Sequence, residues 1–207
     1  MTKTRVACIG DSITFGAHLE NREEECYPAW LQKWLGPDYD VRNFGVSGCT
    51  LIRKGTPTVW TQLPEIEKMN PELVFIMLGT NDTCGGERKC WDHKDEYYGD
   101  FCDLVNILQS LPAKPKIWLC SSPPMEITTP GLDGARIANL EEREPRLQEL
   151  RKKTLKLASE KNCDFIDINT PLKGRPDLFR VGDGVHPNNA GAKAIAEIVY
   201  NAVNNIS

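Results

Sequence analysis

Short runs of apolar and β-forming residues alternate along this chain with segments in which apolar residues recur at helical spacing. The β-forming runs lie at positions 5–9, 40–44, 73–78, 116–120 and 165–168. The helical segments lie at 28–35, 97–111, 140–161 and 190–203, with a weaker one at 64–69. Strand alternating with helix in this way predicts a parallel sheet that is covered by helices on both faces.

The same pattern predicts how the chain is organised into domains. No linker, repeat or low-complexity tract interrupts the 207 residues. The first, third and fourth runs are almost continuously apolar, as strands buried on both faces are. We therefore expect residues 1–207 to form a single three-layer α/β/α domain of the flavodoxin-like kind, with a five-stranded parallel sheet. Pro145 lies inside the third helical segment, where it is expected to kink the helix or to restart it.

Charge and hydropathy exclude two classes of partner. The net charge is −4, from 25 basic and 29 acidic residues, whereas a surface that binds nucleic acid is basic. The apolar run at 73–78 is far shorter than the ~20 residues of a membrane-spanning helix. No signal peptide is recognisable at the start, so we expect a cytoplasmic protein, or an exported one if the sequence begins at a mature terminus. The oligomeric state is not indicated.

Eight cysteines and three histidines raise the question of a disulfide framework or a metal site. The chain contains no C-x-x-C pair, and histidine is too scarce for a zinc site of the usual spacing. We therefore expect reduced thiols, no metal and no cofactor. A disulfide between Cys84 and Cys90, within one loop, is left open, and Cys26 or Cys49 is a further partner if the protein is exported.

Polar segments follow four of the five predicted strands. They span residues 10–14, 43–50, 79–82 and 183–187. Ligands of open parallel sheets bind outside the carboxyl ends of the strands, so these segments are the predicted functional site.

Together the four segments supply the parts of a serine esterase. Ser12 is the predicted nucleophile, and His186 is the base that takes its proton and later protonates the leaving alcohol. Asp183 is placed to bind the other imidazole nitrogen and to hold the tautomer. The N–H groups of Ser12 and Gly48 and the side-chain amide of Asn81 are the predicted hydrogen-bond donors to an oxyanion.

These residues occur in four short blocks whose order resembles that of the SGNH (GDSL-like) hydrolase superfamily. The blocks are Gly10-Asp11-Ser12, Gly48, Gly79-x-Asn81-Asp82 and Asp183-x-x-His186. The resemblance extends over nearly the whole chain. It implies Ser12, Gly48, Asn81 and His186 as the name-giving residues of the superfamily, with Asp183 completing the triad.

Two further segments resemble bacterial carbohydrate O-acetylesterases, including sialate O-acetylesterase-like members. They are Tyr27-Pro28-x-x-Leu31-Gln32 and residues 43–48. Cys49 departs from that pattern, because such proteins often carry Asp or Ala at this place. The departure concerns the shape of the pocket and leaves the triad intact.

Each predicted site residue also has a purely structural interpretation. Taken alone, Ser12 is typical of a helix cap, Asn81 of a turn and Gly48 of a tight loop. Ser47 is a rival nucleophile, but a nucleophile elbow needs Gly-x-Ser-x-Gly and Cys49 stands at the last position. One catalytic constellation explains all four blocks, whereas the structural interpretation needs four separate coincidences.

The other two histidines are not expected to be catalytic. His18-Leu19-Glu20 matches the H-x-E of zinc deaminases, but the P-C-x-x-C that accompanies it is missing. We expect His18 and His93 to lie in loops or to line a pocket.

The sequence thus predicts a hydrolase of small-molecule or carbohydrate esters that forms an acyl-Ser12 intermediate and prefers acetyl groups. The rim segments 80–99 and 121–139 contain no sustained apolar stripe, and a longer acyl chain gains ~0.8 kcal/mol per methylene only where apolar walls bury it. Trp60 and Trp91 are candidates for contact with a sugar ring, and Asp11 and Thr80 for polar contact with the substrate. The alternatives are a lysophospholipase or thioesterase and, in another class, a non-catalytic binding module on the same fold.

Overall fold

The computed structural model describes residues 2–204 and contains a five-stranded sheet in which each strand is parallel to its neighbours. The strand order is β2-β1-β3-β4-β5. The strands are β1 (Thr4–Gly10), β2 (Tyr39–Gly45), β3 (Leu73–Met77), β4 (Lys116–Cys120) and β5 (Asp164–Ile166). The predicted strands are confirmed, although the last one ends at Ile166 rather than at position 168.

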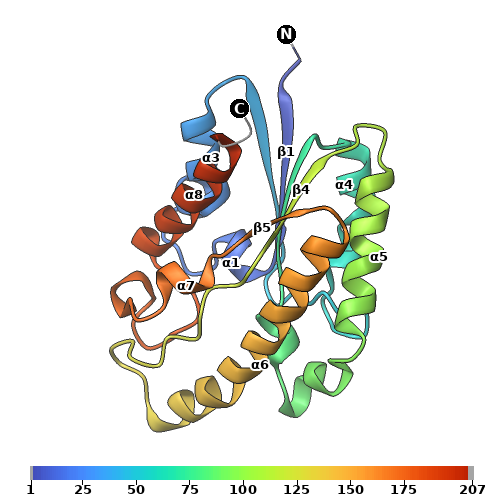
Figure 1. The fold of residues 1–207 in the computed structure, drawn as a ribbon. Coiled ribbons are helices and arrows are strands. Elements are labelled where there is room, and N and C mark those ends of the chain that lie inside the picture. Colours follow the sequence, from blue (N-terminus) through green and yellow to red (C-terminus); the bar gives the residue numbers. More distant parts are fainter. Residues whose placement is uncertain (1, 205–207) are drawn as a thin grey trace.

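Helices cover both faces of the sheet, as predicted (Figure 1). One face carries α1 (Ser12–Phe15), α3 (Tyr27–Leu35) and α8 (Asn189–Asn204), and the other carries α4 (Leu63–Met69), α5 (Tyr97–Ser110) and α6 (Gly134–Glu160). Short helices in the connections are α2 (Arg22–Glu25), α7 (Asn169–Leu172) and the 3-10 turns η1 (Val59–Thr61), η2 (Asn81–Thr83), η3 (Gly86–Arg88), η4 (Cys90–His93) and η5 (Pro176–Leu178).

The strands send alternate side chains into two apolar layers. In β1, Val6 and Cys8 pack with α3 and α8, whereas Ala7 and Ile9 pack with α4, α5 and α6. Both faces of a strand are therefore apolar, which is why the β-forming runs read as nearly continuous rather than as alternating polar and apolar residues.

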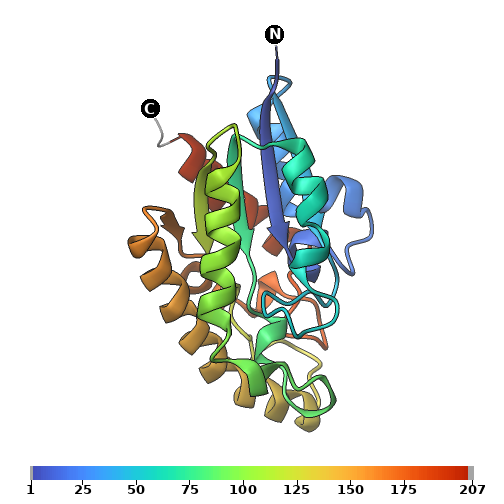
Figure 2. The ribbon, with the colours of Figure 1, turned by 90° about the vertical axis from the view of Figure 1, so that its right-hand side faces the viewer.

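Helix α6 is longer than the sequence pattern indicated. It begins at Gly134, after Asp133 accepts a hydrogen bond from the backbone N–H of Arg136, and it continues through Pro145 to Glu160. Of the two outcomes predicted at Pro145, a kink or a restart, the restart does not occur, because the helix is continuous. It changes direction along its length in both views (Figures 1 and 2), as expected where a proline removes one backbone donor and its ring crowds the preceding turn.

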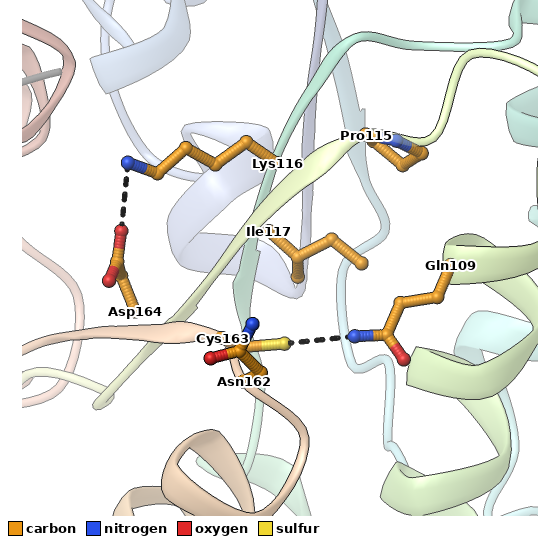
Figure 3. A pocket seen from close by; sticks show the side chains of 7 residues that line it. All are labelled: Gln109, Pro115, Lys116, Ile117, Asn162, Cys163 and Asp164. Carbon is orange, nitrogen blue, oxygen red and sulfur yellow. Dashed lines mark hydrogen bonds and ion pairs between the residues drawn. The ribbon is translucent and has the colours of Figure 1, made fainter.

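The two ends of the sheet differ in chemistry. In Figure 2 the strands point downward, and the loops that follow their carboxyl ends gather below the sheet. At the amino ends of β4 and β5 lies a pocket of about 320 Å³ (Figure 3). That pocket contains an ion pair between Lys116 and Asp164 and a hydrogen bond from Gln109 to Cys163. It holds none of the predicted site residues, which all lie at the opposite end.

The cysteines are free thiols, and Cys8 and Cys120 are buried. Cys84 and Cys90, whose pairing the sequence left open, are both free thiols in this structure. None of the helices in residues 2–204 is both long enough and apolar enough to cross a bilayer.

Candidate active site

Ser12 is the first residue of α1 and follows β1 directly, at the switch point of the strand order between β1 and β3. The turn before it is tight, because a Cβ on Gly10 would lie only 2.0 Å from Oγ1 of Thr14. Asp11 caps the helix: its Oδ1 accepts a hydrogen bond from the N–H of Ile13 at 2.9 Å. These contacts place Ser12 at the mouth of the sheet.

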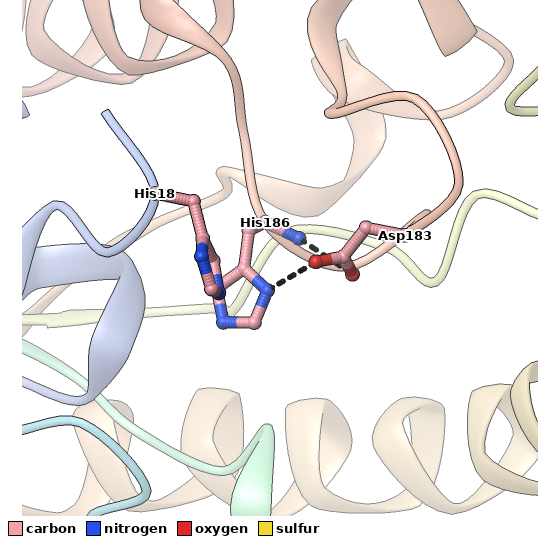
Figure 4. A group of neighbouring side chains, drawn as sticks. All are labelled: His18, Asp183 and His186. Carbon is pink, nitrogen blue, oxygen red and sulfur yellow. Dashed lines mark hydrogen bonds and ion pairs between the residues drawn. The ribbon is translucent and has the colours of Figure 1, made fainter. Parts of the chain in front are cut away.

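His186 reaches Ser12 from the loop that precedes α8. Oγ of Ser12 lies 2.9 Å from Nε2 of His186, which is 174 positions away in the chain. Nδ1 of His186 lies 2.7 Å from Oδ2 of Asp183 (Figure 4). The turn between them needs Gly184, whose φ is +71° and whose Cβ would lie 2.7 Å from a backbone carbonyl oxygen. The structure thus brings the three predicted triad side chains into one chain of hydrogen bonds.

Asp183 is held in its ionised form. Burial alone raises the pKa of a carboxyl, but the hydrogen bond and charge of His186 and the charge of Arg136 outweigh burial and hold the pKa of Asp183 well below its usual range. Arg136 donates from Nη2 to Oδ1 of Asp183 and from Nε to its carbonyl oxygen, both at 2.8 Å. A carboxylate fixed in this way accepts the Nδ1–H of His186, which leaves Nε2 as the acceptor that faces Ser12.

The three predicted oxyanion donors lie at the ends of β1, β2 and β3. The backbone N–H groups of Ser12 and Gly48 donate to no protein acceptor within residues 2–204. Nδ2 of Asn81 donates one hydrogen bond to the carbonyl oxygen of Cys49 at 3.0 Å, which leaves its second N–H available. Arg88 connects the segment after β2 with the segment after β3, because it donates to the carbonyl oxygen of Gly48 at 2.6 Å and to Oδ1 of Asn81 at 2.9 Å.

Comparison with known proteins identifies the family of this chain. The model of the GDSL-like lipase/acylhydrolase family matches residues 8–194. The chain belongs to this family. The acetylxylan esterase of Xylanibacter ruminicola is 32% identical over 218 residues, which cover 96% of this chain and 43% of that protein. The chain spans less than half the length of the curated relatives it matches.

Solved structures of esterases share the fold of this family member. A carbohydrate acetylesterase family member from Sinorhizobium meliloti has a TM-score of 0.75 at 24% identity, with 98% of this chain and 97% of that chain covered. The native aryl esterase of M. smegmatis also has a TM-score of 0.75, at 22% identity, with 99% and 100% covered. At these identities the likeness establishes the common architecture.

Two residues that the sequence predicted at the substrate prove to be buried in the GDSL-like fold. Asp11 is 1% exposed and Thr80 is 3% exposed. Burial raises the pKa of Asp11 to about 6, and this carboxyl caps α1 as described above. Neither side chain has an exposed face with which to contact a substrate, so the structure corrects this expectation.

Trp60 and Trp91 are half-buried, and cations lie on their rings. The guanidinium of Arg53 is 3.7 Å from the ring centroid of Trp60, whose Nε1 donates to the carbonyl oxygen of Leu51. The amine of Lys94 lies 5.0 Å from the ring of Trp91. A sugar ring that stacked on the covered face of either indole would have to displace a cation, so sugar contact by these tryptophans stays a prediction.

The remaining serine and histidine candidates also have definite places. Ser47 is exposed, and within residues 2–204 no hydrogen bond joins it to a histidine. His93 pairs with Glu96 at 3.2 Å, away from the triad. His18 instead lies beside His186, with ring centroids 4.8 Å apart.

Three functional candidates were missed by sequence reasoning. Arg136 binds Asp183. Arg88 binds Asn81 and the carbonyl oxygen of Gly48, two of the residues that supply the predicted oxyanion donors. The buried carboxylate of Asp82 accepts hydrogen bonds from the N–H groups of Leu51 and Ile52 at 3.0 and 2.9 Å, which holds the loop after β2 against the end of β3. Asp82 belongs to the block Gly79-x-Asn81-Asp82 and was therefore identifiable from the sequence. The two arginines carry no local signal, because their partners are distant in the chain.

Proposed function

We propose that this GDSL-like chain is a serine carboxylic ester hydrolase that acts through an acyl-Ser12 intermediate. The observation that carries the proposal is the continuous relay from Ser12 Oγ to His186 at 2.9 Å and from His186 to Asp183 at 2.7 Å. Membership of a lipase/acylhydrolase family supports the same reaction class.

The geometry accounts for both halves of the reaction. Nε2 of His186 removes the proton of Ser12 as Oγ attacks the ester carbonyl carbon. The resulting oxyanion lies among the N–H groups of Ser12 and Gly48 and the free N–H of Asn81. The intermediate collapses when His186 gives its proton to the leaving alcohol. His186 then removes a proton from water, whose oxygen attacks the carbonyl carbon of the acyl-Ser12. As the acyl–Oγ bond breaks, His186 returns this proton to Oγ of Ser12 and the carboxylic acid is released.

We further propose that the natural substrate is an acetyl ester of a carbohydrate. A relative that aligns with 96% of this chain is an acetylxylan esterase, and a carbohydrate acetylesterase family member shares the fold. The loop beside the oxyanion donors is polar, since residues 86–89 are Gly, Glu, Arg and Lys and are exposed. Such a rim favours hydroxyl-rich alcohols over fatty chains.

One observation favours a second candidate, a hydrolase of longer acyl esters. A pocket of about 450 Å³ is lined by Met125, Ile127 and Pro145 among others. The segment that forms it is hydrogen-bonded to the turn between Asp183 and His186, because the N–H of Glu126 donates to the carbonyl oxygen of Gly184 at 2.8 Å. An apolar cavity of this size has room for an acyl chain.

The first experiment tests the reaction itself. Purified wild-type protein should hydrolyse p-nitrophenyl acetate, and Ser12→Ala should reduce kcat by at least ~10³, as expected when a triad nucleophile is removed. Ser47→Ala is the matched control and should keep wild-type turnover. Full activity of Ser12→Ala with an unchanged Tm would contradict the assignment, and absence of turnover on every ester would favour the binding module.

The second experiment separates the substrate classes. The values of kcat/KM are compared for p-nitrophenyl acetate, butyrate, octanoate and palmitate, and for acetylated xylo-oligosaccharides and a lysophospholipid. We expect the acetate to be preferred among the simple esters and the acetylated sugars over the lysophospholipid. A steady rise toward octanoate would identify the apolar pocket as an acyl site and overturn the carbohydrate proposal.

A further inference from the structure

His18 lies next to the catalytic base without taking part in the relay. It is exposed, and it follows α1 in a left-handed conformation with φ of +69°. Its ring meets the ring of His186 edge-on, with an interplanar angle of 77°. Figure 4 shows the His18 ring beside His186 on the side away from Asp183.

The ring nitrogens of His18 are not engaged elsewhere, because no hydrogen bond joins them to another group in the part of the chain that the structure describes. One ligand atom each from His18, His186 and Asp183 lies within 4.8 Å of the others. A neutral imidazole nitrogen is a preferred ligand of Zn²⁺ and Ni²⁺. The two histidines therefore offer two possible ligand nitrogens at one place.

We propose that His18 and Nε2 of His186 bind a divalent transition-metal ion of the Zn²⁺ or Ni²⁺ type, which inhibits the enzyme. Asp183 is then not a ligand, since Oδ2 accepts from Nδ1 of His186 and Oδ1 accepts from Arg136. It lies behind the ligating imidazole, in the carboxylate–histidine–metal order that is common in metal sites.

Metal binding requires two side chains, His18 and Ser12, to adjust. Two nitrogens bound at 2.0–2.1 Å in a tetrahedral site are separated by about 3.4 Å. The hydrogen bond from Nδ1 to Asp183 keeps His186 in place. The hydrogen bond from Ser12 to Nε2 is lost when the metal binds there, so His18 and the hydroxyl of Ser12 are the groups that move. Oγ of Ser12, at 2.9 Å from Nε2, is near enough to be a third ligand, and water completes the coordination.

Inhibition is expected because the metal would occupy the lone pair of Nε2 of His186. Nε2 of His186 accepts the proton of Ser12 in the proposed reaction, and it cannot do so while it ligates a cation. Binding itself rests only on the positions of the two imidazoles, whereas inhibition also rests on the proposed role of His186. The two claims are therefore measured separately.

The test compares His18→Asn with His93→Ala. Asparagine tolerates the left-handed backbone of His18 and removes the imidazole, and His93 is the remaining histidine of the chain. Hydrolysis of p-nitrophenyl acetate is measured against Zn²⁺ and Ni²⁺, with each variant normalised to its own metal-free rate. We expect the inhibitory concentration to rise about tenfold or more for His18→Asn, to be unchanged for His93→Ala, and EDTA to restore activity.

Binding is measured without activity in the Ser12→Ala protein, by following the imidazole ¹⁵N resonances on addition of Zn²⁺. The resonances of His18 and His186 should shift together, and the additional variant His18→Asn should abolish the shift of His186. Equal inhibition of wild type and His18→Asn, as expected if a thiol binds the metal, would overturn the proposal, and so would unshifted His18 resonances. Shifts without inhibition of the wild type would support the metal site and contradict the role of His186 as the base.

Discussion

At the scale of single residues, the side-chain amide of Asn81 shows how the site is prepared for a charge that is not yet present. One N–H of Asn81 is bound to the carbonyl oxygen of Cys49, and Oδ1 is bound to Arg88. The amide cannot rotate freely or flip without losing both contacts. Its second N–H is therefore already oriented before the reaction. The donor does not have to reorient when the proposed oxyanion forms, so no reorganisation free energy is lost.

Asn81→Ala should lower kcat by ~10²–10³, the scale observed when one oxyanion donor is removed. The KM for p-nitrophenyl acetate should change little, because the donor acts mainly on the charge of the transition state. Steady-state kinetics measure the two parameters, and the Tm establishes that the variant is folded. A fall in kcat/KM that came entirely from KM would show that Asn81 binds substrate rather than the oxyanion.

A second residue-scale prediction concerns Asp11 and the dependence of stability on pH. Burial raises the pKa of Asp11 to about 6 in the folded protein, whereas an unfolded Asp titrates near ~3.9. Between these values the folded state binds more protons than the unfolded state. The contribution of Asp11 to stability is therefore largest at low pH and falls as the pH rises from about 4 to about 6.

The measurement is the free energy of unfolding of wild type and of Asp11→Asn from pH 4 to pH 8. Asparagine keeps the oxygen that caps α1 and does not titrate. The stability of wild type relative to Asp11→Asn should decrease as the pH rises through about 6 and become constant at higher pH, where Asp11 is ionised in both states. A difference that is flat over this range would show that Asp11 is already ionised in the folded protein at pH 4.

At the scale of secondary structure, the start of α6 matters more for the site than its length. The cap at Asp133 starts the helix at Gly134, and this places Arg136 in the first turn. Arg136 then spans to the loop before α8 and binds Asp183 through two hydrogen bonds of 2.8 Å. A helix that began at residue 140, as the sequence pattern indicated, would not hold the triad carboxylate.

Arg136→Ala should lower kcat by roughly tenfold, since a hydrogen bond to a charged group contributes about 1.5–3 kcal/mol and His186 remains as a partner of Asp183. The KM should change less than kcat, and Arg136→Lys should recover part of the loss because it keeps the charge. Lys152→Ala, on the exposed side of the same helix, is the control. Wild-type kcat for Arg136→Ala would show that His186 alone orients Asp183.

At the scale of the whole molecule, the sheet is the rigid support that aligns loops from four strands. Phe75 in β3 is 0% exposed, and its ring stacks on Trp118 in β4 with centroids 4.7 Å apart. Side chains of this kind hold neighbouring strands in register. The relative positions of Ser12, Gly48 and Asn81 depend on that register, because each follows a different strand.

Phe75→Ala should lower the free energy of unfolding by about 3–5 kcal/mol, the usual range for a large aromatic side chain deleted from a core. Urea denaturation measures the loss. Val181→Ala is the control, because Val181 is 68% exposed and surface substitutions usually change stability by less than ~0.5 kcal/mol. A loss below ~1 kcal/mol for Phe75→Ala would mean that the two apolar layers repack around the cavity.

Much of the architecture and many of the reacting groups were predictable because they depend on patterns among residues that are close together in the sequence. Apolar runs and helical spacing reveal which segments are buried on two faces and which on one. The ends of the strands then locate Ser12 and Asn81 at one edge, since all parallel strands finish there, and His186 was recognisable from its sequence block with Asp183. The burial of Asp11 and Thr80 was not predictable in the same way, because polar residues at a strand end are buried or exposed according to what packs over them.

The sequence by itself therefore determined the order of strands and helices, the edge of the sheet that carries the chemistry, and the identity of the proposed nucleophile and base. Tertiary structure alone decided which charged residues support them. Arg136 meets Asp183 across 47 positions, Arg88 meets Gly48 across 40, and His18 meets His186 only after the sheet has formed. The physical reason is that a charged or imidazole side chain has many acceptable partners in water, and only the folded chain selects one.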